Sequence, residues 1–327
     1  MRPALERVLR GPIVAAVGIC HWDDARTRER HIGHLHATWA FLGEAAGCLR
    51  VGVRRIEVEA GGWSTPAHEH WGEEEIFYVL SGRGLSWQAG EAFEIRAGDC
   101  IVYRAGEGAH TLHALEPLTV LAFGPRRYDE SIGFPRLGMS LVGGRAMESL
   151  DGVVEGAPIQ FVREADAGPP ELPAEPSPRP PTIVNVADIE ADTVERPRIA
   201  RTRRNLGRAA GSEDTGLQHV EVVPGKLSVP QHCHSAEEEI FVVLEGEGVL
   251  LLDEEETEVH PGHVVSRPPA TGVAHAFRAG DAGLTYLAYG TREPNDICWY
   301  PRSKKVSWRG VGIIARVEPL DYWDGED

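Results

Sequence analysis

The sequence predicts an all-β fold built from two tandem barrels. Three observations support it: the chain is duplicated, short apolar runs are separated by glycine-rich turns, and histidines occur in pairs at strand spacing. Apolar runs such as residues 76–80 and 240–244 have the length of single strands, and many short strands with regular turns are typical of closed or double-sheet β architecture. In a helical bundle that binds a metal, the metal-binding side chains would lie three or four positions apart in the sequence. The histidine pairs lie two positions apart, which argues against such a bundle.

The duplication appears as a constant displacement along the chain. The segment LGEAAG at residues 42–47 returns as LGRAAG at 206–211, displaced by 164 positions. Towards the end of each copy the displacement becomes 166, because residues 123–126 correspond to 289–292. Each half therefore contains a complete copy of one structural unit.

The repeat divides the chain into three parts. Seven prolines crowd residues 166–181, and proline cannot donate to a sheet and favours an extended spacer. We therefore expect a first barrel at residues 1–165, a proline-rich linker at 166–181 and a second barrel at 182–327.

Composition restricts the compartment and the partners. The 327 residues are 42% hydrophobic and 25% charged, as in ordinary globular proteins. A formal net charge of −17 disfavours nucleic-acid binding, and no apolar stretch is long enough to span a membrane. Five scattered cysteines fit neither a disulfide framework nor a C-x-x-C zinc pattern. We expect a cytoplasmic protein with reduced thiols whose partner is a small-molecule substrate or ligand; the oligomeric state stays open, with a homodimer as one option.

Histidines and carboxylates recur in matching positions of the two copies. Each copy has a His-x-His pair, and on a strand residues two apart share a face, so both rings point the same way. A glutamate triplet follows at residues 73–75 and 237–239, and a later histidine completes each set. Three imidazoles and one carboxylate suit a divalent first-row metal. The histidines are His68, His70 and His110 in the first copy and His232, His234 and His275 in the second.

These spacings resemble the cupin superfamily, whose first motif reads G-x5-H-x-H-x3,4-E-x6-G. The gap of six residues before the closing glycine selects Glu75 in the first copy and Glu239 in the second. The second motif, G-x5-P-x-G-x2-H-x3-N, is matched more loosely: His110 comes one residue late, and both copies lack the final asparagine. His113 therefore stays open as an alternative to His110.

The resemblance covers about residues 19–165 and 183–327 and implies two cupin barrels of the double-stranded β-helix, or jelly-roll, type. It also implies one divalent transition metal per barrel, with iron, manganese, nickel and zinc as the options. The function we expect is that of a metal-dependent, dioxygenase-like oxidoreductase acting on a small organic molecule. The alternatives are a metal-dependent isomerase or decarboxylase and a non-catalytic cupin that binds or senses a small ligand.

Strand alternation also predicts which side chains surround the substrate. Phe77 and Phe241 lie two residues after the predicted glutamate ligands, and Phe277 lies two residues after His275, so all three should face the barrel interior. No lysine or arginine falls at these inward positions, which favours an apolar or aromatic substrate over a phosphorylated sugar. The sequence identifies no catalytic acid or base.

Overall fold

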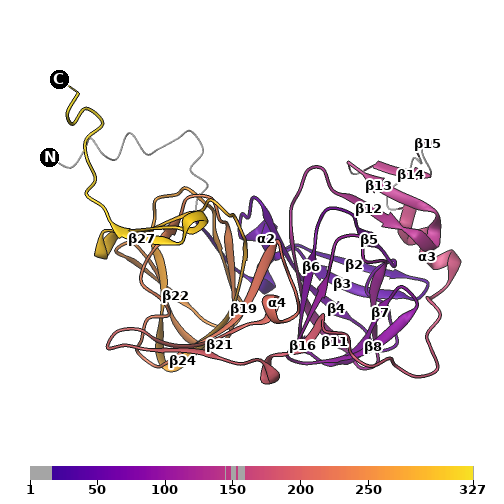
Figure 1. Cartoon of the computed structure of the whole chain (residues 1–327). Coiled ribbons are helices and arrows are strands. Elements are labelled where there is room, and N and C mark those ends of the chain that lie inside the picture. The colour runs from indigo at the N-terminus through magenta and orange to yellow at the C-terminus, as the bar shows by residue number, and fades with distance from the viewer. Residues whose placement is uncertain (1–16, 144, 149–151, 154–158, 327) are drawn as a thin grey trace.

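The computed structural model describes residues 17–143, 145–148, 152–153 and 159–326. Two β-barrels lie side by side, the first in indigo to magenta and the second in orange to yellow (Figure 1). The predicted all-β fold of two tandem barrels is confirmed, since strands dominate the described chain and its helices are short. The helical segments are α2 (Leu42–Ala45), α3 (Ile159–Ala167), α4 (Leu206–Ala209), and the 3-10 turns η1 (Trp22–Asp24), η2 (Pro135–Leu137), η4 (Val186–Asp188), η5 (Pro301–Ser303) and η6 (Arg309–Val311).

A seven-stranded sheet and a three-stranded sheet form the first barrel. The larger sheet has the order β16-β9-β6-β11-β4-β3-β2, and the smaller has the order β10-β7-β8. Within the first copy, their strands are β2 (Thr27–Ile32), β3 (Leu35–Ala40), β4 (Val51–Val58), β6 (Glu75–Ser81), β7 (Arg83–Gln88), β8 (Glu91–Arg96), β9 (Asp99–Tyr103), β10 (His110–Ala114) and β11 (Leu118–Pro125).

One eight-stranded sheet forms most of the second barrel, with the order β1-β23-β21-β24-β19-β18-β17 and β22 paired to β21. Two of its strands, β21 and β24, are long and curved. Each of them is continuous where the first barrel has two separate strands. Within the second copy, the strands are β17 (Asp192–Glu195), β18 (Ala200–Asn205), β19 (Thr215–Val222), β21 (Glu239–Leu252), β22 (Glu255–Val259), β23 (His263–Arg267) and β24 (His275–Thr291).

A smaller sheet at one end of each barrel carries the second histidine of each His-x-His pair. In the first barrel β5, which contains His70, pairs with β12, and in the second β20, which contains His234, pairs with β25. The two small sheets contain β5 (Glu69–His70), β12 (Ser131–Phe134), β13 (Met139–Val142), β14 (Arg145–Glu148) and β15 (Gly152–Val153), and β20 (Cys233–His234), β25 (Ile297–Tyr300), β26 (Lys305–Trp308) and β27 (Ile313–Arg316).

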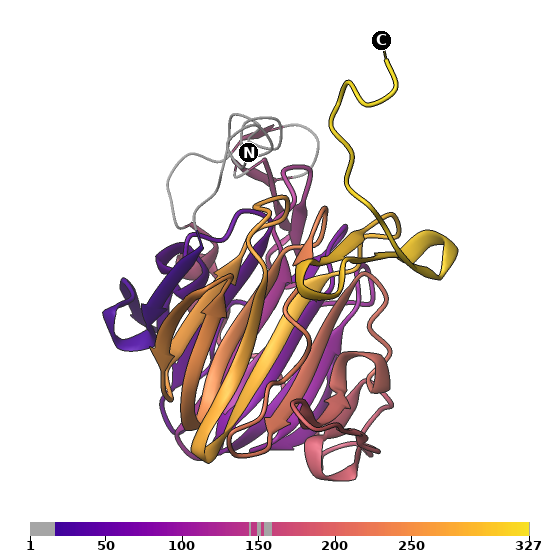
Figure 2. The same ribbon diagram turned by 90° about the vertical axis from the view of Figure 1, so that its left-hand side faces the viewer.

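The two copies exchange their first strands. β1 (Gly18–His21) precedes the first barrel in sequence but pairs with β23 of the second, while β16 (Ile183–Asn185) pairs with β9 of the first. Figure 2 shows the indigo start of the described chain beside the orange strands. The sheet of the first barrel therefore extends beyond the predicted linker. The domain boundaries stay a prediction, and residues 1–16 of the predicted first domain lie outside the described residues.

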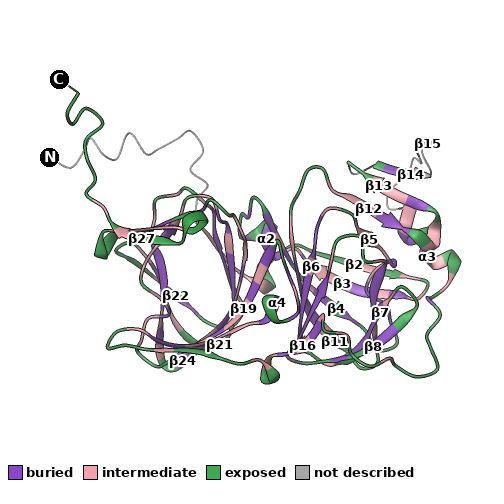
Figure 3. Ribbon diagram, in the orientation of Figure 1, coloured by how far each residue is buried: buried purple, intermediate pink, exposed green. Residues whose placement is uncertain are grey.

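The continuous apolar runs lie between two cores. On β6, Phe77 and Val79 belong to the interior of the first barrel, whereas Ile76 and Tyr78 belong to a core that both barrels share. A strand buried on both faces needs apolar residues at every position, which explains why residues 76–80 do not alternate with polar ones. Figure 3 shows the buried residues concentrated inside the barrels and between them.

The backbone conformation explains why a glycine closes the first motif in each copy. Gly82 and Gly246 have φ angles of 87° and 76°, which L side chains rarely adopt. A Cβ atom would lie 2.0 Å from the Pro117 carbonyl oxygen at Gly82 and 2.1 Å from the Gly283 carbonyl oxygen at Gly246. Only glycine fits where the chain turns out of the strand that begins at the predicted glutamate ligand.

Among the described residues, no helix combines the length and apolar character needed to cross a membrane.

Candidate metal centres

In the first barrel, the four predicted ligands come together from separate segments. His70 lies on β5, Glu75 begins β6, His110 begins β10, and His68 forms an isolated bridge with His110. The Nε2 atoms all approach Glu75 Oε2, at 3.8 Å for His68, 3.5 Å for His70 and 3.1 Å for His110. The three imidazoles thus surround one carboxylate oxygen.

The second barrel repeats this arrangement. Nε2 of His234 lies 3.5 Å and Nε2 of His275 lies 3.1 Å from Glu239 Oε2. The ring of His232 lies with its centroid 4.7 Å from that of His275 and 5.0 Å from that of His234. The structure therefore brings together all eight residues that the motif spacing selected, four in each barrel.

Hydrogen bonds on the far side of the rings orient the imidazoles. His68 Nδ1 lies 2.9 Å from the Pro66 carbonyl oxygen, which requires its proton to be on Nδ1, and His232 makes the same contact with Pro230. An Nδ1 proton leaves Nε2 as a free lone pair that points at the glutamate.

The second histidine of each pair has a carboxylate partner instead. Nδ1 of His70 lies 3.2 Å from Glu130 Oε1, and Nδ1 of His234 lies 2.7 Å from Asp296 Oδ2. Carboxylates behind ligand histidines fix the ring and raise its basicity. Sequence reasoning missed Glu130 and Asp296, although they are displaced by 166 positions like the neighbouring segments, and this repeat was the available signal.

The charge distribution is the same in both clusters. Burial acts to lower the pKa of His70 and of His234, but the neighbouring carboxylates outweigh it and raise both pKa values to about 9. The largest of these contributions come from Glu75 and Glu239, and Glu130 and Asp296 add to them. Burial lowers the pKa of His68 and of His232 to about 3. Without a metal, each centre therefore carries one protonated and two neutral imidazoles around an ionised glutamate.

The residues present fit a divalent metal. Nε2 of His70, Nε2 of His234 and Oε2 of Glu239 are buried and have no hydrogen-bond partner within the described part of the chain, which is rare for polar atoms. The ligand atoms of His68, His70 and Glu75 lie within 4.8 Å of one another, as do those of His232, Glu239 and His275. Imidazole nitrogen with one carboxylate oxygen is a donor set for manganese, iron, nickel or zinc.

The alternative fourth histidine lies elsewhere. His113 contacts the Gly62 carbonyl oxygen at 3.2 Å through Nδ1, and its ring packs on Trp63 with centroids 4.8 Å apart. His110, three residues earlier, occupies the place beside Glu75.

Aromatic side chains fill the interior of the first barrel. The ring of Tyr103 stacks on His110 with centroids 3.8 Å apart and an angle of 5° between the planes, and Phe77 packs edge-on against Tyr103. The cavity that reaches His68, His70 and Glu75 has a volume of about 270 Å³, and Phe77 is not part of its lining.

The second barrel has a larger and more polar cavity, of about 720 Å³. Phe241 and Phe277 line it as expected from strand alternation, next to the histidine cluster. The expectation of an apolar pocket is incomplete, however, because Arg201 and Arg203 from β18 line the same cavity. The cavity volume falls in the range of small-molecule sites.

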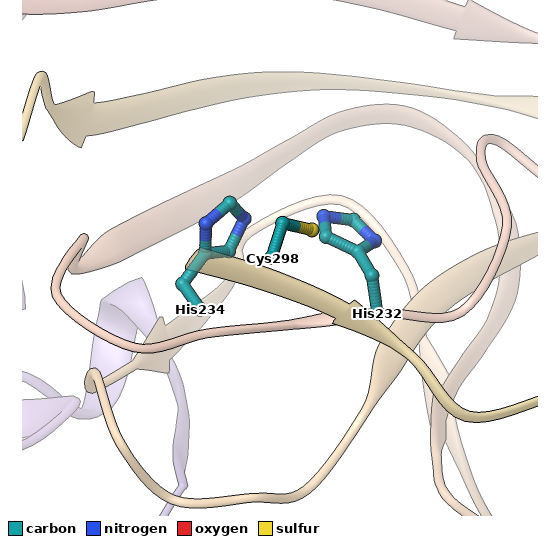
Figure 4. Close-up of side chains that lie close together, drawn as sticks. All are labelled: His232, His234 and Cys298. Atoms are coloured by element: carbon teal, nitrogen blue, oxygen red, sulfur yellow. The ribbon is translucent and has the colours of Figure 1, made fainter. Parts of the chain in front are cut away.

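A cysteine that sequence reasoning did not select lies beside the second cluster. Cys298 on β25 places its sulfur beside the ring of His232 (Figure 4), and its Sγ and the ring nitrogens of His232 and His234 lie within 4.8 Å of one another. Burial raises the pKa of the Cys298 thiol to about 12, so the thiol is protonated at neutral pH. Ile132 occupies the equivalent position in the first copy, which makes the two centres chemically different.

Comparison with known proteins agrees with this architecture. The family model described as "Cupin domain" matches residues 54–124 and again 218–288. Auxin-binding protein 1 of Arabidopsis thaliana is 29% identical over 158 residues, which cover 44% of this chain and 73% of that protein.

Two solved structures share the fold across most of the chain. The Mn(II)-containing oxalate decarboxylase of Bacillus subtilis has a TM-score of 0.55 at 15% identity and covers 88% of this chain and 80% of its own. Vicilin from tomato (Solanum lycopersicum) has a TM-score of 0.54 at 14% identity and covers 86% and 87%. Because the family matches fall at corresponding places in the two barrels, the chain is a bicupin of the cupin superfamily.

Proposed function

We propose that the protein is a metal-dependent enzyme that holds one divalent transition metal in each barrel and acts on a small organic molecule in the second. The observation that carries this proposal is the convergence of imidazole nitrogens on one glutamate oxygen in both barrels. The second barrel is the proposed reaction site because the cavity that reaches its histidine cluster is the larger one. Its volume is about 720 Å³, whereas the cavity in the first barrel has a volume of about 270 Å³.

Each group around the centre has a proposed role. His232, His234, Glu239 and His275 would hold the metal, and Asp296 would keep His234 in the tautomer whose Nε2 faces the centre. A metal bound there supplies Lewis-acid polarisation of substrate oxygens or a place to activate dioxygen. Phe241 and Phe277 line the cavity and would exclude water from the reacting end of the substrate.

Oxidation by dioxygen is the reaction we propose first, with iron or manganese as the metal. The cavity wall formed by Phe241 and Phe277 suits an apolar substrate of the kind that ring-cleaving dioxygenases take. Decarboxylation is the second reaction, because the Mn(II)-containing oxalate decarboxylase shares the two-barrel fold.

Ligand binding without turnover is a separate candidate function. The match to an auxin-binding protein over 44% of the chain favours it, since that relative is named for binding a small molecule. The same cavity would then act as a receptor site.

Metal content per chain tests the proposal. Protein purified without added metal is analysed by mass spectrometry beside His70→Ala and His234→Ala variants, with His113→Ala as a matched histidine control. We expect close to two equivalents of metal in the parent and in the control, and close to one in each of the other variants. Metal-free parent protein with an intact fold would overturn the two-centre assignment.

Turnover distinguishes the candidate functions. The metal-loaded protein is mixed with a library of small aromatic and aliphatic compounds, and oxygen uptake and carbon dioxide release are recorded in parallel. Oxygen uptake supports the dioxygenase, and carbon dioxide release without oxygen uptake supports the decarboxylase. Saturable binding of a compound that is recovered unchanged supports the receptor.

A further inference from the structure

Two arginines project from β18 into the second barrel. Arg201 pairs with Val222 and Arg203 pairs with Val220 across the β18–β19 ladder. Both valines belong to the interior core of this barrel, and residues paired across strands point to the same face. The arginines therefore face the interior, and they line the same cavity as Glu239.

The first barrel has no such pair at these positions. With the displacement of 164, Arg201 corresponds to Ala37 and Arg203 to Trp39. Ala37 is buried in the first interior core, and Trp39 packs against that core. The repeat has thus kept the metal ligands in both copies but placed positive charge in one interior only.

The charge of these arginines is incompletely balanced. Both contact a single carboxylate, Asp192: Arg203 Nη2 lies 2.6 Å and Arg201 Nη1 lies 3.5 Å from its Oδ2. The Asp192 side chain is 52% exposed, whereas that of Arg201 is 10% exposed. One solvated carboxylate cannot neutralise two guanidinium groups, and a buried charge is stable only when it is paired.

Two other arginines of the cavity have partners of their own. Arg309 donates to Glu237, and Arg292 donates to the carbonyl oxygens of Ser212 and Glu213. Glu239 belongs to the histidine cluster. Arg208 also lines the cavity, but it is exposed on α4. Arg201 and Arg203 are therefore the interior-facing arginines of this cavity that are placed to take an incoming anion.

A third guanidinium adds positive charge at the cluster. Arg267 lies opposite Glu239 in the β21–β23 ladder and is 3% exposed. Its Nε and Nη1 atoms have no hydrogen-bond partner among the described residues. The equivalent residue in the first barrel is Tyr103.

From these contacts we infer that the second barrel binds an organic acid, with its carboxylate on Arg201 and Arg203 and its apolar body against Phe241, Phe277 and Tyr286. The inference rests on the proposed function, because it names the substrate class of the same cavity. A planar guanidinium binds a carboxylate through two parallel hydrogen bonds, so the pair would fix the acid in one orientation relative to the histidine cluster.

Calorimetric titration with benzoate and with its neutral analogue benzamide tests the assignment. The proteins are the parent, the Arg201→Gln/Arg203→Gln double variant and an Arg204→Gln control. Arg204 lies on the same strand but pairs with Glu221 outside the cavity, so the control removes the same kind of charge without altering the site. Acetate, phenylacetate and inorganic phosphate serve as additional probes, and metal content and thermal unfolding are measured on each sample.

We expect benzoate to bind the parent and the control equally, and the double variant at least tenfold more weakly. Benzamide should bind the parent at least tenfold more weakly than benzoate. Equal binding of benzoate by the parent and the double variant, equal binding of benzamide and benzoate, tighter binding of phosphate, or no saturable binding of any carboxylate would each overturn the inference. If the double variant does not fold, Arg203→Gln alone replaces it.

The metal measurement separates the two proposals. A metal-free protein that still binds benzoate through the arginines would retain this inference and overturn the proposed function. A metal-loaded protein that does not bind carboxylates would retain the proposed function and overturn this inference.

Discussion

Glu74 and Glu238, the middle residues of the two glutamate triplets, reach across the barrel interface in opposite directions. Glu238 accepts hydrogen bonds from the backbone N–H groups of residues 49–51 in the first barrel. Glu74 accepts hydrogen bonds from the backbone N–H groups of Glu213 and Thr215 and from the hydroxyl groups of Ser212 and Thr215 in the second. Both side chains are buried. Each triplet therefore places one carboxylate at a candidate metal centre and directs the preceding carboxylate into the neighbouring barrel.

Replacing Glu238 by alanine should destabilise the protein strongly. The substitution leaves three backbone N–H donors without their acceptor, and each unsatisfied buried donor costs about 1–3 kcal/mol. We expect the free energy of unfolding in urea to fall by about 3–5 kcal/mol. Glu254→Ala, on an exposed turn, is the control and should change it by less than about 0.5 kcal/mol. Similar losses in both variants would show that the bonds across the interface contribute little.

The carboxylates behind the histidines should control metal affinity one barrel at a time. Asp296→Asn removes the charge behind His234, and Glu130→Gln does so behind His70. Loss of such a partner usually lowers metal affinity about 10–100-fold. Competition with a fluorescent chelator should show one weakened site and one unchanged site in each variant. Two weakened sites in either variant would contradict the independence of the two centres.

Metal binding should release protons, because His70 and His234 hold them at neutral pH. Their pKa values of about 9 mean that both imidazoles are protonated below that pH, and a metal binds only the neutral ring. Affinity should therefore rise about tenfold per pH unit between pH 6 and pH 9, then level off. Titration of Mn²⁺ at pH 7 in two buffers of different ionisation enthalpy should give about one proton per metal. His70→Ala should leave the release at the second site intact, whereas pH-independent affinity would contradict the charge assignment.

The predicted metal ligands needed only local information. His68 and His70 share a strand face, and Glu75 follows within a few residues, so alternation and motif spacing were sufficient. Glu130 lies 60 residues beyond His70 on a different segment, and no local pattern connects the two. Arg201 and Arg203 lie in the strand sequence ARTRRN, whose polar character is that of an exposed strand rather than a barrel interior.

The exchange of β1 and β16 between the barrels could not be predicted from the sequence, for a different reason. Because the copies are similar, β9 and β23 present equivalent edges, and either edge satisfies the pairing pattern of β1 or β16. The sequence shows that each copy has this strand, but which barrel it joins depends on the path of the connecting chain. That path is visible only in three dimensions.

The proline-rich segment should contribute to stability, although its composition predicts a simple spacer. Arg179, within it, donates both terminal nitrogens to Asp99 of the first barrel, at 2.9 Å and 2.8 Å. Asp99 is fully buried and also accepts from Asn185 of the exchanged strand β16, so one carboxylate joins linker, barrel and exchanged strand.

Arg179→Met keeps the aliphatic part of the side chain and removes the charge that balances Asp99. Breaking a buried pair on one side costs about 3–5 kcal/mol, and the partial exposure of Arg179 places the expected loss at the lower end, about 3 kcal/mol. Arg83→Met, which breaks the exposed Arg83–Glu116 pair, is the control and should cost less than about 1 kcal/mol. Thermal unfolding of both variants measures the difference. Equal unfolding temperatures would mean that the linker is only a spacer, whereas a selective loss in Arg179→Met would show that the segment between the two copies is part of the first barrel's structure.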